Sequence, residues 1–296
     1  MMNPGQRQKI GAFFDRLFVA FHSLLPTHFL SWLMFHLAQV KNGAFKNAFI
    51  GSFVKLYGVD LSEAELELVK NYPDFNTFFT RALKAGARPL DPDPKSLISP
   101  VDGTVSQLGP VRNGAIIQAK GIDYTVAELL GGSKAAGFFN KGSFCTIYLA
   151  PYNYHRIHMP ANGKMREWSY EPGRLFSVSA LAQRTIPKLF ARNERVCALF
   201  ETDHGPLAVI MVGALFVGSI ETVWNGRVTP PHGQKAGVYS PMSSVVLLRG
   251  RELGRFNMGS TVIILAPPGM VAWRPELKPG VPVRMGASLG ALTKIR

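Results

Sequence analysis

The character of the chain changes at Pro89, and this change restricts the folds that are open to it. Before Pro89, apolar and aromatic residues recur at helical spacing. After it, short β-branched runs alternate with glycine, proline, asparagine and aspartate. Helices and strands that occupy separate stretches of a chain are typical of α+β proteins. We therefore predict an α+β fold, in which N-terminal amphipathic helices pack on a largely antiparallel, β-rich body.

Three apolar runs are expected to form the N-terminal helices. They cover residues 14–25, 29–37 and 45–56, and Pro26 and Gly43 separate them. A membrane-spanning helix needs about 20 predominantly apolar residues, whereas histidines, a threonine and a proline interrupt the first two runs. Short amphipathic helices with aromatic faces and basic flanks instead favour insertion into the headgroup region of a bilayer. The alternative is that they are ordinary core helices.

The region after these runs carries helix signals of its own. Ser62 followed by Glu65 resembles a capping box, which predicts a helix that continues through Val69. A second short helix is expected over residues 75–83. The expected regions are a helical membrane-anchoring region (1–60), a helical connector packed on the body (61–95) and a β-rich domain that carries the chemistry (96–296).

The charge of the chain indicates its kind of partner. Lys and Arg number 33 against 19 Asp and Glu, a formal net charge of +14, and such an excess favours an anionic partner. The basic residues are spread along the chain without a nucleic-acid-binding motif, so we expect anionic membrane lipid and no nucleic acid. We expect a peripheral or monotopic protein on the cytoplasmic face of the cell membrane.

Two cysteines, Cys145 and Cys197, both lie inside apolar runs. Residues in such runs are usually buried, and a free buried cysteine behaves as a small apolar side chain. The N-terminus shows no compact signal-peptide pattern. The sequence therefore predicts reduced thiols in a protein that faces the cytoplasm.

Three segments carry residues that could do chemistry. Gly259-Ser260-Thr261 leads into an apolar strand, and Asp102-Gly103 precedes another; either alone would normally be a turn. His155 and His158 stand three residues apart, and flanking prolines favour a loop or strand end over a helix. Two histidines at this spacing could bind a metal, but no third ligand stands at a convincing spacing, and we predict no metal.

Taken together, these segments resemble bacterial phosphatidylserine decarboxylases. The resemblance is carried by RFNMGSTVI, SPVDGTVSQLG and YHRIHMPANG, with further agreement in FNTFFTRALK, PGRLFSVS and VGSIETVWNGRVTPP. It extends from about Phe75 to the C-terminus. The family usually has leucine where this chain has Met258, and this exchange of similar apolar residues is mild.

The resemblance implies that the chain cuts itself between Gly259 and Ser260 into a β chain (1–259) and an α chain (260–296). Ser260 then becomes a covalent pyruvoyl group, so no external cofactor is needed. This group forms a Schiff base with the amine of phosphatidylserine, and loss of CO2 yields phosphatidylethanolamine. The resemblance further implies a heterodimer of the two chains and a homodimer of these heterodimers.

The resemblance also assigns roles to four residues. Asp102 and His158 would assist Ser260 in the cut, and His155 would assist decarboxylation or reprotonation. An acid, a base and a hydroxyl are the side-chain types that acyl transfer requires. The active site is expected where these segments meet.

Two other functions remain open at this point. The same Asp102, His158 and Ser260 could serve a serine hydrolase, although the chain lacks a G-x-S-x-G motif. The protein could also be a non-enzymatic membrane-binding protein. A cut before Ser260 distinguishes the decarboxylase, because a hydrolase keeps its free hydroxyl.

Overall fold

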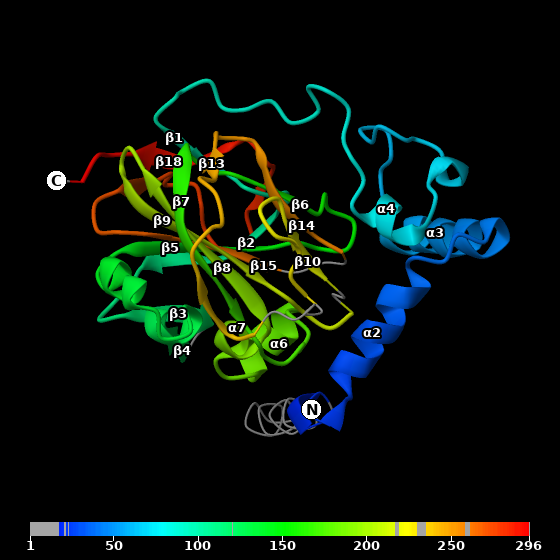
Figure 1. Cartoon of the computed structure of the whole chain (residues 1–296), viewed down its shortest axis with the longest axis horizontal. Coiled ribbons are helices and arrows are strands. Elements are labelled where there is room, and N and C mark those ends of the chain that lie inside the picture. Colours follow the sequence, from blue (N-terminus) through cyan, green and yellow to red (C-terminus); the bar gives the residue numbers. More distant parts are fainter. Residues whose placement is uncertain are drawn as a thin grey trace, which may run out of the picture.

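The computed structural model describes residues 18–20, 22, 24–119, 121–216, 219–229, 235–257 and 261–295. It has an α+β fold in which the N-terminal helices α2, α3 and α4 gather on one side of a β-rich body (Figure 1). The helices are α2 (Thr27–Leu37), α3 (Gly43–Tyr57), η1 (Val69–Asn71, a 3-10 helix), α4 (Phe75–Phe79), α5 (Val126–Leu129), η2 (Lys134–Phe139, a 3-10 helix), α6 (Ala180–Thr185) and α7 (Leu189–Arg192).

The body is built from strands that pair antiparallel throughout the named sheets. This confirms the predicted fold class and the antiparallel body. The strands are β1 (Ser96–Ile98), β2 (Gly103–Pro110), β3 (Ala115–Ala119), β4 (Ile122–Thr125), β5 (Ser143–Tyr148), β6 (Arg156–His158), β7 (Gly163–Glu171), β8 (Arg195–Thr202), β9 (Gly205–Val212), β10 (Ile220–Thr222), β11 (Gly226–Arg227), β12 (Gly237–Tyr239), β13 (Val246–Leu247), β14 (Glu252–Phe256), β15 (Thr261–Ala266), β16 (Val271–Trp273), β17 (Pro282–Val283) and β18 (Ser288–Leu292).

A nine-stranded sheet forms the centre of the body. Its order is β12-β7-β8-β9-β15-β5-β2-β17, and β13 also pairs with β7. Smaller sheets have the orders β11-β10-β14-β6, β1-β18-β16 and β3-β4. Every residue of β15 is buried, as is every residue of β9 after Gly205. A strand buried on both faces consists of a continuous run of apolar residues, so β15 could be recognised as a strand from the sequence.

The helical region has a separate small core made largely of aromatic rings. Phe49 of α3 stacks on Phe75 of α4 with ring centroids 4.3 Å apart, and Phe53 meets the same ring edge-on at 5.1 Å. Asn42 and Asp74 cap the N-termini of α3 and α4 by accepting the backbone N–H groups of residues 45 and 77. The aromatic core therefore holds α3 and α4 together as one unit.

The positions of α2 and α3 confirm the second and third predicted helical runs, whereas much of the first run lies outside the described residues. None of the helices in the described part of the chain is long and apolar enough to cross a membrane.

The helix predicted from Ser62 is wrong. The backbone N–H of Ser62 donates to Asp60 Oδ1 at 2.8 Å, and the N–H of Glu65 donates to the distant carbonyl of Ala82 at 3.0 Å. A local turn and a long-range bridge therefore take the groups that a capping box would use. Residues 61–95 contain the short helices η1 and α4, and α4 ends at Phe79, before the predicted Leu83.

Candidate active site

Three strand ends bring the candidate residues to one edge of the large sheet. Thr104 of β2 and Thr261 of β15 both pair with Tyr148, the last residue of β5. Asp102 therefore lies just before β2 at the same edge where the chain enters β15. Met258, Gly259 and Ser260, which contain the predicted cut and directly precede Thr261, lie outside the described residues.

The loop that leaves β5 at this edge and the strand after it carry the two histidines. The loop leads to His155 and then to β6, which ends at His158. The backbone carbonyl of His155 accepts the N–H of Phe256 at 3.1 Å, and the next residue, Asn257, donates to the carbonyl of Ser219 at 2.9 Å. The prediction of a strand-end loop is confirmed, and His155 lies beside the segment that leads to the cleavage site.

Position 103 requires a glycine because two strands approach each other closely there. A Cβ atom at this position would collide with the backbone carbonyl oxygen of Tyr148. Asp102-Gly103 therefore does not form the hairpin turn that these residue types usually indicate. The missing side chain lets β2 start directly against the end of β5, which fixes Asp102 at the edge.

Asp102 is buried and paired with an arginine. Arg88 donates from Nε to Asp102 Oδ1 and Oδ2 at 2.8 and 3.1 Å and from Nη2 to Oδ2 at 2.5 Å. The N–H of Met285 also donates to Oδ1 at 2.8 Å. Burial alone would lower the pKa of Arg88, but Asp102 and Glu63 raise it overall. The Asp102 carboxylate is therefore held rigidly by charge-assisted hydrogen bonds.

His158 is a neutral imidazole in a fixed tautomer. Its Nδ1 lies 2.8 Å from the carbonyl oxygen of Gly250, which can only accept, so Nδ1 carries the proton. Its Nε2 is then the basic nitrogen, and it accepts from the hydroxyl of Tyr154 at 2.9 Å. Burial is the main cause of its lowered pKa. A neutral histidine whose basic nitrogen accepts a hydrogen bond from a hydroxyl has the form that a general base requires.

The expected pair of Asp102 and His158 lies at one edge without a direct hydrogen bond. The bonds of Asp102 go to Arg88 and Met285, and those of His158 go to Gly250 and Tyr154. Asp102 still interacts electrostatically with His158 and favours its charged form. The sequence analysis did not identify Arg88 or Tyr154. Tyr154 could have been identified, because it directly precedes His155 in the same motif.

His155 is the most deeply buried member of the site. Its Nδ1 donates to the carbonyl of Asn153 at 2.8 Å, and its ring lies against Phe79 with centroids 4.0 Å apart. Burial, helped by the nearby positive charge of Arg81, lowers its pKa to about 3. Its Nε2 has no hydrogen-bond partner among the described residues. The ring is therefore neutral at neutral pH, and its Nε2 is an acceptor without a partner among the described residues.

Two residues that flank the cleavage segment also carry buried polar atoms. Asn257 Oδ1 and Thr261 Oγ1 have no hydrogen-bond partner within the described ranges. Buried polar atoms without partners are rare in proteins and each needs an explanation. Like His155 Nε2, they are buried polar atoms that could bind a group at the site.

Two pockets lie on either side of the loop after β5. The first, here called the apolar pocket, has a volume of about 400 Å³ and extends from the helical region to the sheet edge. Its walls include Phe53, Phe79, Tyr148 and Leu215. The second, here called the polar pocket, has a volume of about 310 Å³, and Arg81, Arg88, Asp102, Tyr154 and Arg284 contribute to its walls.

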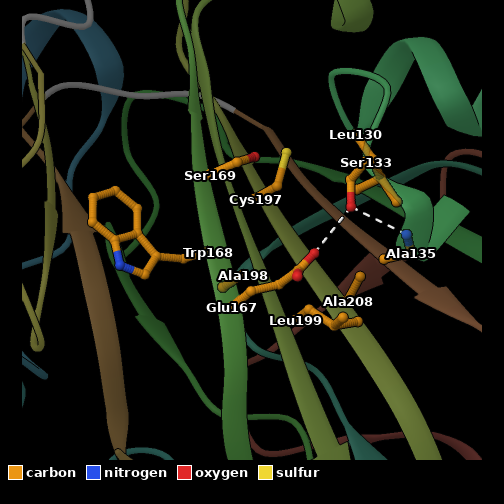
Figure 2. A pocket seen from close by; sticks show the side chains of 10 residues that line it. All are labelled: Leu130, Ser133, Ala135, Glu167, Trp168, Ser169, Cys197, Ala198, Leu199 and Ala208. Carbon is orange, nitrogen blue, oxygen red and sulfur yellow. Dashed lines mark hydrogen bonds between the residues drawn. The ribbon is translucent and has the colours of Figure 1, made fainter. Parts of the chain in front are cut away.

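A third cavity, beside Cys197, has no features of a reaction centre. It has a volume of about 20 Å³, and Ser133 there donates to Glu167 at 2.9 Å and accepts from the N–H of Ala135 at 3.1 Å (Figure 2). Both cysteines are free and buried, as predicted. Burial raises the pKa of Cys145 to about 12 and that of Cys197 to about 11, so neither is a thiolate at neutral pH. Among the described residues, no cluster of His, Cys, Asp or Glu could hold a metal ion.

Comparison with known proteins covers nearly the whole chain. A family model described as phosphatidylserine decarboxylase matches residues 75–291, and a model described as PSD matches residues 17–58. A phosphatidylserine decarboxylase proenzyme of Pseudomonas fluorescens is 52% identical over 279 residues, covering 93% of this chain and 97% of the relative. Proteins of the same name from Bordetella avium and Nitrosococcus oceani are 51% and 50% identical, covering 93% and 94% of this chain and 94% and 92% of the relatives.

Proposed function

Because the chain belongs to the phosphatidylserine decarboxylase family, we propose that it converts phosphatidylserine to phosphatidylethanolamine and CO2 at a membrane surface. It first cuts itself between Gly259 and Ser260, and Ser260 becomes the pyruvoyl group of the mature enzyme. One observation carries the proposal beyond family membership. Asp102 and the entry to β15 lie where β5 ends, and the loop after β5 carries His155, whose carbonyl accepts from Phe256 just before the cleavage segment.

His158 is the proposed base for the cut. Ser260 Oγ must lose a proton to attack the carbonyl of Gly259, whose missing side chain leaves that carbonyl open. His158 is suited to take this proton, because it is neutral and its orientation is fixed by a backbone carbonyl. Asp102 stabilises the imidazolium that results. Tyr154 occupies Nε2 beforehand, so its hydroxyl either gives way to Ser260 or passes the proton on.

The residues around the cleavage segment fit a pyruvoyl group there. The Thr261 hydroxyl can donate to a carbonyl oxygen, and Asn257 Oδ1 and His155 Nε2 can accept from an incoming amine. Once formed, the group supplies a ketone that accepts the electron pair left by departing CO2. His155 is neutral near pH 7, so we assign it to take up a proton at Nε2 and return it to carbon.

The cut chains stay together because the new α chain begins in the centre of the sheet. β15 is hydrogen-bonded on one side to β5 and on the other to β9, and it is buried throughout. The proposed products are therefore a β chain (1–259) and an α chain (260–296) in one heterodimer. Two such heterodimers form the proposed homodimer.

The helical region is the proposed membrane contact. Helix α2 exposes Phe29, Trp32 and Leu33, and the apolar pocket opens beside these helices towards the sheet edge. A diacyl substrate can then keep its chains in lipid while its headgroup reaches the site. The net charge of +14 favours an anionic bilayer. We propose peripheral attachment to the cytoplasmic face of the cell membrane, with residues 1–60 as anchor, 61–95 as connector and 96–296 as catalytic domain.

Intact-mass spectrometry of the wild-type chain beside Ser260→Ala tests the proposal. The wild type should yield separate chains of residues 1–259 and 260–296, and the α chain should be lighter than its sequence mass by one ammonia. Ser260→Ala should stay whole and release no CO2 from phosphatidylserine. A whole wild-type chain in an active preparation would contradict the proposal and favour a serine hydrolase.

A further inference from the structure

Arg81 is a buried cation in the wall of the polar pocket, and most of its hydrogen-bonding capacity is unused. The residue is 5% exposed, and its Nη2 donates to the carbonyls of Tyr152 and Asn153 at 3.0 and 3.4 Å. Its Nε and Nη1 have no hydrogen-bond partner among the described residues. A buried charge without compensating partners is costly, so its retention calls for a reason.

Arg195 shows how this fold treats an arginine whose role is structural. It is 4% exposed and, like Arg81, it donates to backbone carbonyls. However, all three of its nitrogens are used: Nε donates to Leu129, Nη1 to Ala191 and Asn193, and Nη2 to Glu128, at 2.6 to 3.1 Å. The two arginines are similarly buried, but Arg195 uses all three of its nitrogens in hydrogen bonds, whereas Arg81 uses one.

The acids of the polar pocket do not supply the missing partner. Asp102 is bound by Arg88 through three hydrogen bonds. Glu63 accepts from Arg88 at 2.8 Å and is also paired with Arg284. Asp60, the third acid in the wall, accepts from the backbone N–H and the hydroxyl of Ser62 at 2.8 and 3.0 Å and interacts with Arg81 only through its charge. None of these three carboxylates is hydrogen-bonded to Arg81. Within the described residues, Arg81 therefore forms no ion pair, although nearby acids and the ring of Phe78, whose centroid lies 5.6 Å from its guanidinium carbon, partly offset its charge.

Arg81 also stands close to the reacting end of the proposed site. The ring of Phe79, two residues before it, lies against that of His155 with centroids 4.0 Å apart, and Arg81 itself interacts electrostatically with His155 and Asp102. From Arg81, Nη2 holds the loop that carries His155, while Nε and Nη1 are left for a ligand. A group bound here would thus lie in the polar pocket near His155 and Asp102, the residues assigned to the reaction.

We infer that Arg81 binds an oxyanion of the substrate headgroup, and that this oxyanion is the phosphodiester. The inference rests on the proposed function. Phosphate and carboxylate both suit a guanidinium. However, a cation that holds the departing carboxylate would stabilise the ground state more than the transition state, because that charge is lost as CO2 leaves. The phosphodiester keeps its charge throughout, so binding it does not oppose the reaction.

The test measures lipid capture as well as turnover. Processed wild type and Arg81→Met are incubated with short-chain, soluble phosphatidylserine or phosphatidylethanolamine. Cyanoborohydride then reduces the bond between the lipid amine and the α-chain ketone, and the modified α chain is quantified by intact mass. Only cut chains are counted, so incomplete processing does not affect the half-saturating lipid concentration. We expect Arg81→Met to raise this concentration about tenfold or more for both lipids, as loss of charged hydrogen bonds predicts. Arg81→Lys, which keeps the charge, should recover part of the loss.

Arg156→Met is the matched control. Arg156 donates to the carbonyl of Thr80 at 2.9 Å, so it ties the same two segments together without contributing to the walls of the polar pocket. It should leave half-saturation near the wild-type value even if the protein is less stable. An equal rise in Arg156→Met, or no rise in Arg81→Met, would overturn the inference. A rise for phosphatidylserine alone would keep the oxyanion site and reassign it to the carboxylate. If the wild type is uncut or captures neither lipid, the proposed function itself fails.

Discussion

The β body and helix α2 bury opposite kinds of side chain. In the body, β15 and nearly all of β9 place apolar residues in a closed core. In α2, the buried residues are Thr27 and Ser31, at 2% and 3% exposure, while Phe29 and Trp32 are 58% and 50% exposed. Ser31 Oγ faces the body and accepts the N–H of Phe216 at 3.1 Å. Helix α2 therefore buries polar side chains and exposes apolar ones, which is the reverse of a helix that covers a core.

This difference shows which region buries its apolar residues within the protein and which leaves them exposed. The central strands of the body bury their apolar residues within the protein, although the body also exposes apolar side chains such as Met242 and Leu248. The outward face of α2 presents contiguous aromatic rings, with Phe29 and Trp32 centroids 6.0 Å apart, and such exposed apolar faces are typical of membrane or protein contacts. The proposed division of labour follows: chemistry in the body, lipid contact in the helices.

The largest expected effects come from variants of the two histidines, because we assign them to different steps of the reaction. His158→Gln should leave the chain uncut, whereas His155→Gln should be cut but decarboxylate about 100- to 10,000-fold more slowly, the usual contribution of an acid–base group. Intact mass and CO2 release measure the two steps separately. Tyr154→Phe removes one hydrogen bond to His158 and should slow the cut less. If both histidine variants are uncut, the assigned division of roles is wrong.

A second prediction compares stability in the two regions. Ile263→Ala in the centre of β15 should lower the free energy of unfolding by about 2–5 kcal/mol, because it leaves a cavity in a buried strand. Leu33→Ala on the exposed face of α2 should change it by no more than about 0.5 kcal/mol. Urea denaturation followed by circular dichroism gives both values. Similar losses in both variants would show that α2 packs against protein in solution.

The sequence predicted the elements whose signals are local and continuous. The apolar runs of β5 and β15 and the helical spacing of α2 and α3 each lie within a few residues, and the structure has these elements where they were expected. The convergence of Asp102 and His155 at one edge followed from family resemblance, since strand order cannot be read from spacing. The pairing of both Thr104 and Thr261 with Tyr148 supplies the physical reason.

What the sequence could not predict depends on long-range partners. The Ser62 capping signal is local, but Glu65 bonds to Ala82 and overrides it. Arg88 gives no sign in the sequence that it will pair with Asp102, because the contact closes a loop between them. The unused nitrogens of Arg81 are likewise a property of packing alone.

A third prediction tests the helical face directly. Replacing Phe29, Trp32 and Leu33 with serine should weaken binding to anionic vesicles on the order of a hundredfold, at about 1 kcal/mol for each partly buried side chain. Cleavage and turnover of a short-chain soluble substrate should persist. The matched control replaces Val223, Val238 and Val246, which are exposed on the body. Vesicle sedimentation measures both variants. An equal loss in the control would place the membrane contact on the body.

The last comparison concerns pH and again separates the regions. Burial lowers the pKa of His155 from 6.5 to about 3, so between these values the unfolded chain binds a proton that the folded chain does not. Stability therefore rises with pH across this window, by up to about 1.4 kcal/mol per pH unit for this group, and is lost as pH falls. His158, whose pKa is also lowered, acts in the same direction.

His155→Gln should flatten this rise measurably, and the matched control is His36→Gln on the exposed face of α2. Urea unfolding at intervals between pH 4 and 7 yields the slopes. A wild-type slope in His155→Gln would mean that His155 binds its proton in the same pH range in the folded and unfolded chains. Burial would then not keep His155 unprotonated below pH 6.5, and the predicted pH dependence of stability would have to come from other groups.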